Sequence, residues 1–154
     1  MRVVIRKEII FSCSLDKSVK AWTLFNNNLK YEFTHSSQID DMVIGRKGTP
    51  LHNQILSISN DRSCRVSNLE TGAEMKKIDF DSSCRSIAVD KSQTMIAIGT
   101  DANVTFIETT NFTKVKEVSL NDPVYSLAFN RQNDCMLAIT KKGEVHSFKF
   151  RSKH

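Results

Sequence analysis

The feature that most constrains this chain is a pattern that returns about every forty residues. Four segments share it, each with an apolar stretch, then a turn with acidic residues or Gly, then an alternating strand. Their turn positions are Asp16, Asp61, Asp101 and Lys142, which are 45, 40 and 41 residues apart. Repeats of this length are single supersecondary units that cannot bury an apolar face alone, so the pattern predicts a stack of similar units.

Each repeat is expected to form a small antiparallel sheet. Residues 86–89 and 95–98 are almost continuous small or branched apolar side chains, as in strands covered on both faces, whereas residues 114–120 alternate like an outer strand. No amphipathic helical stretch competes. The sequence thus predicts an all-β segment over residues 1–154, made of four-stranded antiparallel sheets like the blades of a β-propeller. The repeats occupy about 1–35, 36–80, 81–120 and 121–150, the last without an outer strand, before a basic tail at 151–154.

The first turn carries a recognisable motif. The stretch Ser14-Leu-Asp-Lys-Ser-Val-Lys-Ala-Trp22 resembles the WD-repeat family, in which a turn Asp is followed six residues later by a Trp. The resemblance covers nearly the whole chain. It implies a hydrogen-bonded set of turn Asp, strand hydroxyl, Trp and loop His that locks each blade. By resemblance this set comprises Asp16, Asp61 and Asp101 as the turn Asp, Ser14 and Ser59 as the hydroxyl, Trp22, and His35 in Thr34-His35.

The later repeats depart from the family pattern. The Trp position holds Ser67, Ile107 and Phe148, and the turn Asp is replaced by Lys142 in the last repeat. One side-chain hydrogen bond contributes only about 1 kcal/mol net, so sheet packing and main-chain pairing can sustain the fold without the full set. The departures therefore bear on the subfamily more than on the fold.

Four repeats leave a question of closure. Propellers have roughly four to eight blades, so the chain corresponds to an incomplete ring or to a small closed one. An open array exposes apolar sheet surface at both ends, which costs about 25 cal/mol for each Å². Three solutions are open: a longer parent chain, completion by further copies or another chain, or closure on itself. In the last two, residues 2–5 could supply the missing outer strand of the last repeat, although they could equally form an inner strand of the first.

The positive charge is concentrated at one end of the chain. The net charge is +5, but residues 141–154 hold five basic residues and one acidic residue, which leaves +1 for the rest. A solvated edge strand and tail account for such an excess. A nucleic-acid or anionic-lipid binding module is therefore the alternative and not the leading expectation. It would use the following residues: Lys141, Lys142, Lys149, Arg151 and Lys153.

No sequence pattern points to catalysis, a metal or a cofactor. The chain lacks nucleophile-elbow, phosphate-loop, His-Glu-x-x-His and calcium-loop motifs. Its four cysteines form no Cys-x-x-Cys pair, so we expect reduced thiols in an intracellular protein, cytoplasmic or nuclear. No run approaches the roughly 18 apolar residues of a membrane span, and the first residues lack a signal-peptide core. We expect a protein that is not an enzyme, with no cofactor and no membrane span.

A binding role follows from the expected shape. Propellers present loops on a rigid rim, where recognition concentrates. In WD-repeat proteins the contact surface includes the loops before the inner strands, which by resemblance are residues 38–42, 82–85 and 121–125. We therefore expect a scaffold for protein–protein interactions. Its candidate contact residues are Arg85 and Tyr125, which are enriched types at interfaces, together with Asp41 and Asp122.

Overall fold

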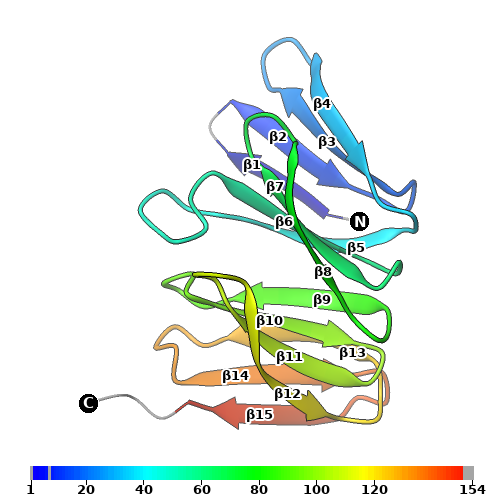
Figure 1. The fold of residues 1–154 in the computed structure, drawn as a ribbon, viewed down its shortest axis with the longest axis vertical. Coiled ribbons are helices and arrows are strands. Elements are labelled where there is room, and N and C mark those ends of the chain that lie inside the picture. Colours follow the sequence, from blue (N-terminus) through cyan, green and yellow to red (C-terminus); the bar gives the residue numbers. More distant parts are fainter. Residues whose placement is uncertain (1, 7, 151–154) are drawn as a thin grey trace. The chain divides into compact units, whose positions relative to one another are not determined.

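The computed structural model describes residues 2–6 and 8–150. Within those ranges it contains β-strands, turns and bends but no helix, and therefore no helix that could cross a membrane. The strands form four antiparallel sheets that follow one another along the chain (Figure 1). The predicted all-β, antiparallel architecture is confirmed.

Each repeat of the sequence corresponds to one sheet. Sheet 1 contains β1 (Arg2–Arg6), β2 (Ile9–Cys13), β3 (Ser18–Thr23) and β4 (Leu29–Thr34). Sheet 2 contains β5 (Ile39–Ile44), β6 (Gln54–Ser59), β7 (Ser63–Asn68) and β8 (Glu74–Asp79). Sheet 3 contains β9 (Cys84–Val89), β10 (Met95–Thr100), β11 (Asn103–Glu108) and β12 (Thr113–Ser119). Sheet 4 has three strands, β13 (Val124–Phe129), β14 (Cys135–Thr140) and β15 (Val145–Lys149).

The N-terminal strand belongs to sheet 1. β1 pairs with β2 from Arg2 opposite Cys13 to Arg6 opposite Ile9, so it is the inner strand of the first sheet and not an outer strand of sheet 4. Only two residues separate the two strands, and a hairpin this short pairs at a low entropic cost.

The chain divides into two compact units. The first comprises residues 1–45 and 53–84 and holds sheets 1 and 2, and the second comprises residues 46–52 and 85–154 and holds sheets 3 and 4 from Arg85 onward. Each unit has a core of its own between its two sheets.

In the first unit, the inner strand of sheet 2 packs on sheet 1. Met42, which is fully buried, and Ile44 come from β5 and join Phe11 and Cys13 of β2 in one cluster. The second unit repeats the arrangement. Leu127 and Phe129 of β13 pack against a cluster that includes Ala97 of β10. Apolar residues every second position along these strands explain the pattern, because alternate side chains share a face.

Three of the turns between second and third strands share one backbone conformation. Lys17, Arg62 and Gly143 have φ of 72°, 65° and 84° and occupy the same place in the turns after β2, β6 and β14. A left-handed residue at the end of a short hairpin loop lets the next strand start in register. The turn after β10 is one residue shorter, because Gly99 pairs with Val104 where sheet 2 pairs Ile58 with Cys64.

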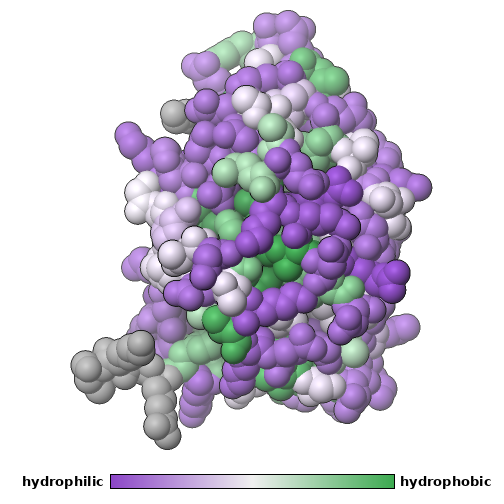
Figure 2. Space-filling model, in the orientation of Figure 1, coloured by the Kyte–Doolittle hydropathy of each residue, from purple (hydrophilic) through white to green (hydrophobic). Residues whose placement is uncertain are grey.

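The outer strands are the most exposed. Most residues of β8 and β12 are accessible to water, and hydrophilic side chains predominate on the face of the molecule in Figure 2. Short, charged outer strands protect a sheet edge from pairing with other chains.

Candidate functional site

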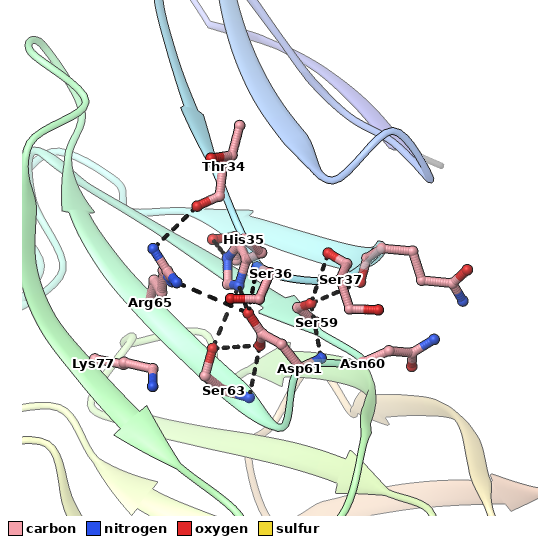
Figure 3. Close-up of polar contacts among 12 residues, drawn as sticks. Thr34, His35, Ser36, Ser37, Ser59, Asn60, Asp61, Ser63, Arg65 and Lys77 are labelled. Atoms are coloured by element: carbon pink, nitrogen blue, oxygen red, sulfur yellow. Dashed lines mark hydrogen bonds and ion pairs between the residues drawn. The ribbon is translucent and has the colours of Figure 1, made fainter.

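The densest polar cluster of the first unit is centred on His35, in the loop between β4 and β5. The ring Nδ1 lies 3.1 Å from Oδ2 of Asp61, and Nε2 lies 2.8 Å from Oγ of Ser57. Figure 3 shows Asp61 reaching back from the turn after β6 toward this loop. The cluster therefore ties the connection between sheets 1 and 2 to the turn of sheet 2.

Asp61 collects several donors at once. Its carboxylate accepts hydrogen bonds from the backbone N and Oγ of Ser63, at 3.1 and 2.6 Å, and from the backbone N of Ser36 at 3.0 Å. The guanidinium of Arg65 lies 3.9 Å away. Burial alone raises the pKa of Asp61, but the hydrogen bonds of Ser63 and Ser36 outweigh it, so the pKa lies below its ordinary value. The group is held as a carboxylate.

His35 is held as a neutral ring. Burial lowers its pKa, against the opposing charge of Asp61. A neutral imidazole has one donor and one acceptor nitrogen. Because a carboxylate only accepts, the geometry assigns the proton to Nδ1, which donates to Asp61, and leaves Nε2 to accept from the hydroxyl of Ser57.

Asp61, His35 and Ser57 are connected in the same order as the triad of a serine hydrolase. The His35 side chain and Ser57 are both fully buried, however. A nucleophile needs room for a substrate carbonyl about 3 Å from its oxygen, and a fully buried hydroxyl has none. The arrangement is suited to fixing a loop, not to acyl transfer.

Ser57 bonds to Nε2 of His35 and the hydroxyl of Ser63 lies 3.4 Å from Nδ1, whereas the expected Ser59 bonds elsewhere. The hydroxyl of Ser59 donates to the carbonyls of Ser37 and Gln38, at 3.1 and 2.8 Å, and accepts from the backbone N of Asp61 at 3.1 Å. Ser59 therefore fixes the same loop at Ser37 and Gln38, just after His35.

Sheet 1 contains only part of the expected set. Trp22 Nε1 lies 3.4 Å from Oγ of Ser12, whereas the expected hydroxyl, Ser14, accepts from the backbone N of Asp16 at 3.5 Å. Asp16 accepts from the N and Oγ of Ser18 at 3.0 and 2.7 Å, and these bonds lower its pKa to about 2. Half of the Asp16 side chain is exposed, and no histidine contacts it among the described residues.

Asp101 does not occupy the place that the sequence suggests. Because its turn is one residue shorter, the backbone N of Asn103 bonds instead to Oγ1 of Thr100 at 3.1 Å. The carboxylate of Asp101 accepts from Nε of Arg85 on the neighbouring inner strand, at 2.7 Å. Arg85, a candidate contact residue, is thus paired with Asp101, which was expected to lock the turn.

Asp122 is also part of the framework. It is only 5% exposed, and its carboxylate accepts from the backbone N of Lys142 at 2.9 Å, which lowers its pKa. This contact mirrors the one between Asp61 and Ser36. In sheet 2 the acid lies on the turn and binds a loop N–H, whereas in sheet 4 the acid lies on the loop and binds a turn N–H.

Of the four candidate contact residues, Tyr125 is the most exposed. Asp41 bonds to Nη1 of Arg2 at 2.6 Å and to the backbone N of Met42 at 2.8 Å. Tyr125 is 57% exposed and lies in a bulge, because Val124 pairs with Thr140 and Ser126 with Ile139 while Tyr125 is skipped. Bulges re-aim side chains next to functional sites.

The basic residues of the C-terminal part that the structure describes lie in two separate places. Lys141 and Lys142 lie in the turn before β15, whereas Lys149 is its last residue. At about 3.3 Å per residue, the strand separates the two groups by roughly 13 Å or more. Arg151 and Lys153 lie outside the described residues.

The cysteines and possible metal ligands show no assembled site. Cys13, Cys64, Cys84 and Cys135 are all free thiols, and burial raises the pKa of Cys64 to about 12. Among residues 2–6 and 8–150, no group of three or more His, Cys, Asp or Glu side chains is placed to hold a metal ion.

Comparisons with known proteins give a fold but no family. No family model matches the chain, and no curated protein matches it. Among solved structures, it is similar to the computationally designed Ika4 protein, with 18% identity, a TM-score of 0.82, and coverage of 97% of this chain and 89% of that one. It is also similar to the designed Ika8 protein, with 18% identity, a TM-score of 0.79, and coverage of 97% and 45%. The chain therefore spans less than half the length of the second structure.

Proposed function

We propose that this chain is a segment of a WD-repeat-type β-propeller that acts as a non-enzymatic scaffold. Protein partners bind the loops that precede the inner strands. Tyr125 carries the proposal, because a large aromatic side chain is presented to water by a bulge at the start of β13. Tyrosine is among the residue types that dominate interface energetics.

The locked loops support this role. A binding surface loses less entropy on association when its backbone is already fixed. In the first unit His35 and Ser59 fix the loop before β5, and in the second unit Asp122 fixes the loop before β13. Arg85 presents its guanidinium at the corresponding part of β9 while paired with Asp101, so it contributes to the surface as a held side chain.

Burial of the His35 cluster supports the non-enzymatic part of the proposal. The hydroxyl with hydrolase-like connectivity, Ser57, is inaccessible, so a fluorophosphonate probe is expected to leave it unlabelled. Adduct formation at Ser57 in the folded protein would contradict the proposal.

The binding role is tested by replacing Tyr125 with a photo-reactive benzoylphenylalanine in the full chain. After irradiation in a cell extract, cross-linked proteins are identified by mass spectrometry. The matched control carries the same group at Val115, which is 52% exposed on outer strand β12 of the same unit. We expect a discrete partner at position 125 that position 115 does not capture.

The identified partner then allows a quantitative measurement. Tyr125→Ala should weaken its affinity by about 30-fold or more, as for an aromatic hot spot, while Val115→Ala leaves it unchanged. Equal capture at both positions, or unchanged affinity of Tyr125→Ala, refutes the assignment of this surface.

A further inference from the structure

One face of sheet 4 is apolar and exposed. Leu137 and Ile139 are each 45% exposed and Val145 is 63% exposed. They lie side by side, because Ile139 pairs with Val145 while Leu137 lies two residues away on the same side of β14. Ala128, which pairs with Leu137 and is also exposed, extends this surface onto β13. We call these four residues the tail face.

Sheet 1 exposes a second apolar surface on its inner strand. Val3 and Ile5 of β1 are 60% and 62% exposed, although both are β-branched strand residues. Ile10 pairs with Ile5 and is half-buried beside it. We call these three residues the head face.

Sheets 2 and 4, the second sheet of each unit, show how residues at these positions pack. In sheet 2, Met42 and Ile44 pair with Ser57 and Ile55, and both pack on the preceding sheet. In sheet 4, Leu127 and Phe129 occupy the same register and likewise pack on the preceding sheet.

The head face has the register of these packing residues. Val3 pairs with Ser12, which lies two residues before Ser14, as Ser57 lies two residues before Ser59. Val3 and Ile5 therefore correspond to Met42 and Ile44. They are built to pack on a preceding sheet.

The tail face lies at the positions on which, in sheet 3, the following sheet packs. In sheet 3 these accepting positions include Ala97 and Gly99, three residues and one residue before Thr100. A Cβ on Gly99 would lie 2.6 Å from the side chain of Val124, so sheet 4 approaches this position closely. Leu137 and Ile139 lie three residues and one residue before Thr140, and they are the equivalent, uncovered positions.

We propose that the tail face of one copy of this chain binds the head face of a second copy. The sizes of the side chains support this pairing. Within the second unit, large Leu127 and Phe129 pack on a cluster that includes the small acceptor Ala97, and Val124 approaches the small acceptor Gly99. At the proposed contact the acceptors Leu137 and Ile139 are larger than Ala97 and Gly99. The residues that pack on them, Val3 and Ile5, are smaller than Leu127 and Phe129, which offsets the difference. Large and small side chains that alternate across a contact fill it to the density of a core.

Two copies together have about the length of one of the similar structures. A single copy covers 45% of the Ika8 structure and 89% of the Ika4 structure. Two copies joined head to tail at both ends give a closed assembly with two identical contacts. This proposal concerns the sheet faces and does not depend on the binding role of Tyr125.

The mass of the full chain in solution tests the proposal. Sedimentation equilibrium and light scattering should give about 35 kDa, twice the 17.5 kDa of one chain. A head variant, Val3→Glu with Ile5→Glu, and a tail variant, Leu137→Glu with Ile139→Glu, should each raise the dissociation constant by about 100-fold or more. All four side chains are exposed, so circular dichroism should show folded variants.

Mixing the two variants distinguishes this contact from other modes of association. The head variant retains a normal tail face and the tail variant a normal head face, so an equimolar mixture should recover dimers through one intact contact. Control variants Met75→Glu and Val115→Glu, on exposed outer-strand positions, should stay dimeric. A monomeric unsubstituted chain overturns the proposal, and so does a head variant that stays dimeric alone or a mixture that stays monomeric.

Discussion

Replacement of Asp61 by Ala should destabilise the first unit about twice as much as the same change at Asp16, the matching turn residue of sheet 1. The Asp61 carboxylate accepts from the ring of His35 and from the backbone N of Ser63, and both donors are buried. Leaving a buried donor unpaired costs about 1 to 3 kcal/mol. For two such donors, the free energy of unfolding should fall by about 4 kcal/mol.

Asp16→Ala is the matched control. Asp16 occupies the same place in its turn and holds Ser18 in the same way, but half of its side chain is exposed and it has no histidine to support. Ser18 is buried like Ser63, so leaving its N–H unpaired should cost about 2 kcal/mol. The remaining difference of about 2 kcal/mol measures the bond to His35.

Urea denaturation followed by tryptophan fluorescence provides the assay. Trp22 is the sole tryptophan of the chain and lies in β3, in the unit that contains both substituted residues. If the two variants lose stability to within about 1 kcal/mol of each other, the reasoning that the buried histidine cluster locks the loop is refuted.

Three further changes have defined outcomes. Because burial places the pKa of His35 below 6.5, the unfolded chain binds more protons just below that pH, so the free energy of unfolding should fall as the pH is lowered from 6.5 toward the folded-state pKa. Urea titrations should show this slope, and His35→Gln should flatten it. The Cys64 thiol, with its pKa near 12, should react with iodoacetamide only on unfolding, which time-resolved mass spectrometry detects; rapid native labelling would contradict its burial. Gly72→Ala should cost about 2 kcal/mol, because φ is +74° and the new Cβ would meet the Tyr31 ring at 2.5 Å. Gly48→Ala, with φ of +80° and open space, should cost about half as much, and equal thermal shifts would exclude the ring contact.

The strands could be predicted because their signal is local. Residues 95–98 and 114–120 have patterns that only a covered or an outer strand explains, and β10 and β12 lie there. Short hairpins then fix the order of strands within each sheet, since a two- or three-residue turn allows only neighbouring pairing.

The sequence could not show which serine hydroxyl of β6 bonds to His35. Ser57 and Ser59 are two residues apart and therefore share a face of β6. Which of them meets His35 depends on how the loop after β4 crosses the sheet, and this is set by contacts between residues distant along the chain. Two serines at this spacing could have been recognised only as a pair of candidates.

The length of the turn after β10 determines where the Asp101 carboxylate lies. The stretch Thr100-Asp101-Ala102-Asn103 resembles the turn that contains Asp61, but it is one residue shorter, which moves the carboxylate from the turn amides to Arg85. Counting residues between the hydroxyl of the second strand and the first residue of the third would have revealed the difference.

The exchange of roles between Asp61 and Asp122 affects how degenerate repeats should be detected. A sequence profile that requires an acidic residue in the turn after the second strand rejects sheet 4, where this position is Lys142. Yet Asp122, two residues before β13, bonds to the same turn. A profile that accepts an acidic residue either in the turn or in the loop before the inner strand would recover such repeats, because either position can link the loop to the turn. Substitutions at the two positions should then compensate for each other in related sequences, so their covariation becomes a detectable signature where neither position alone is informative.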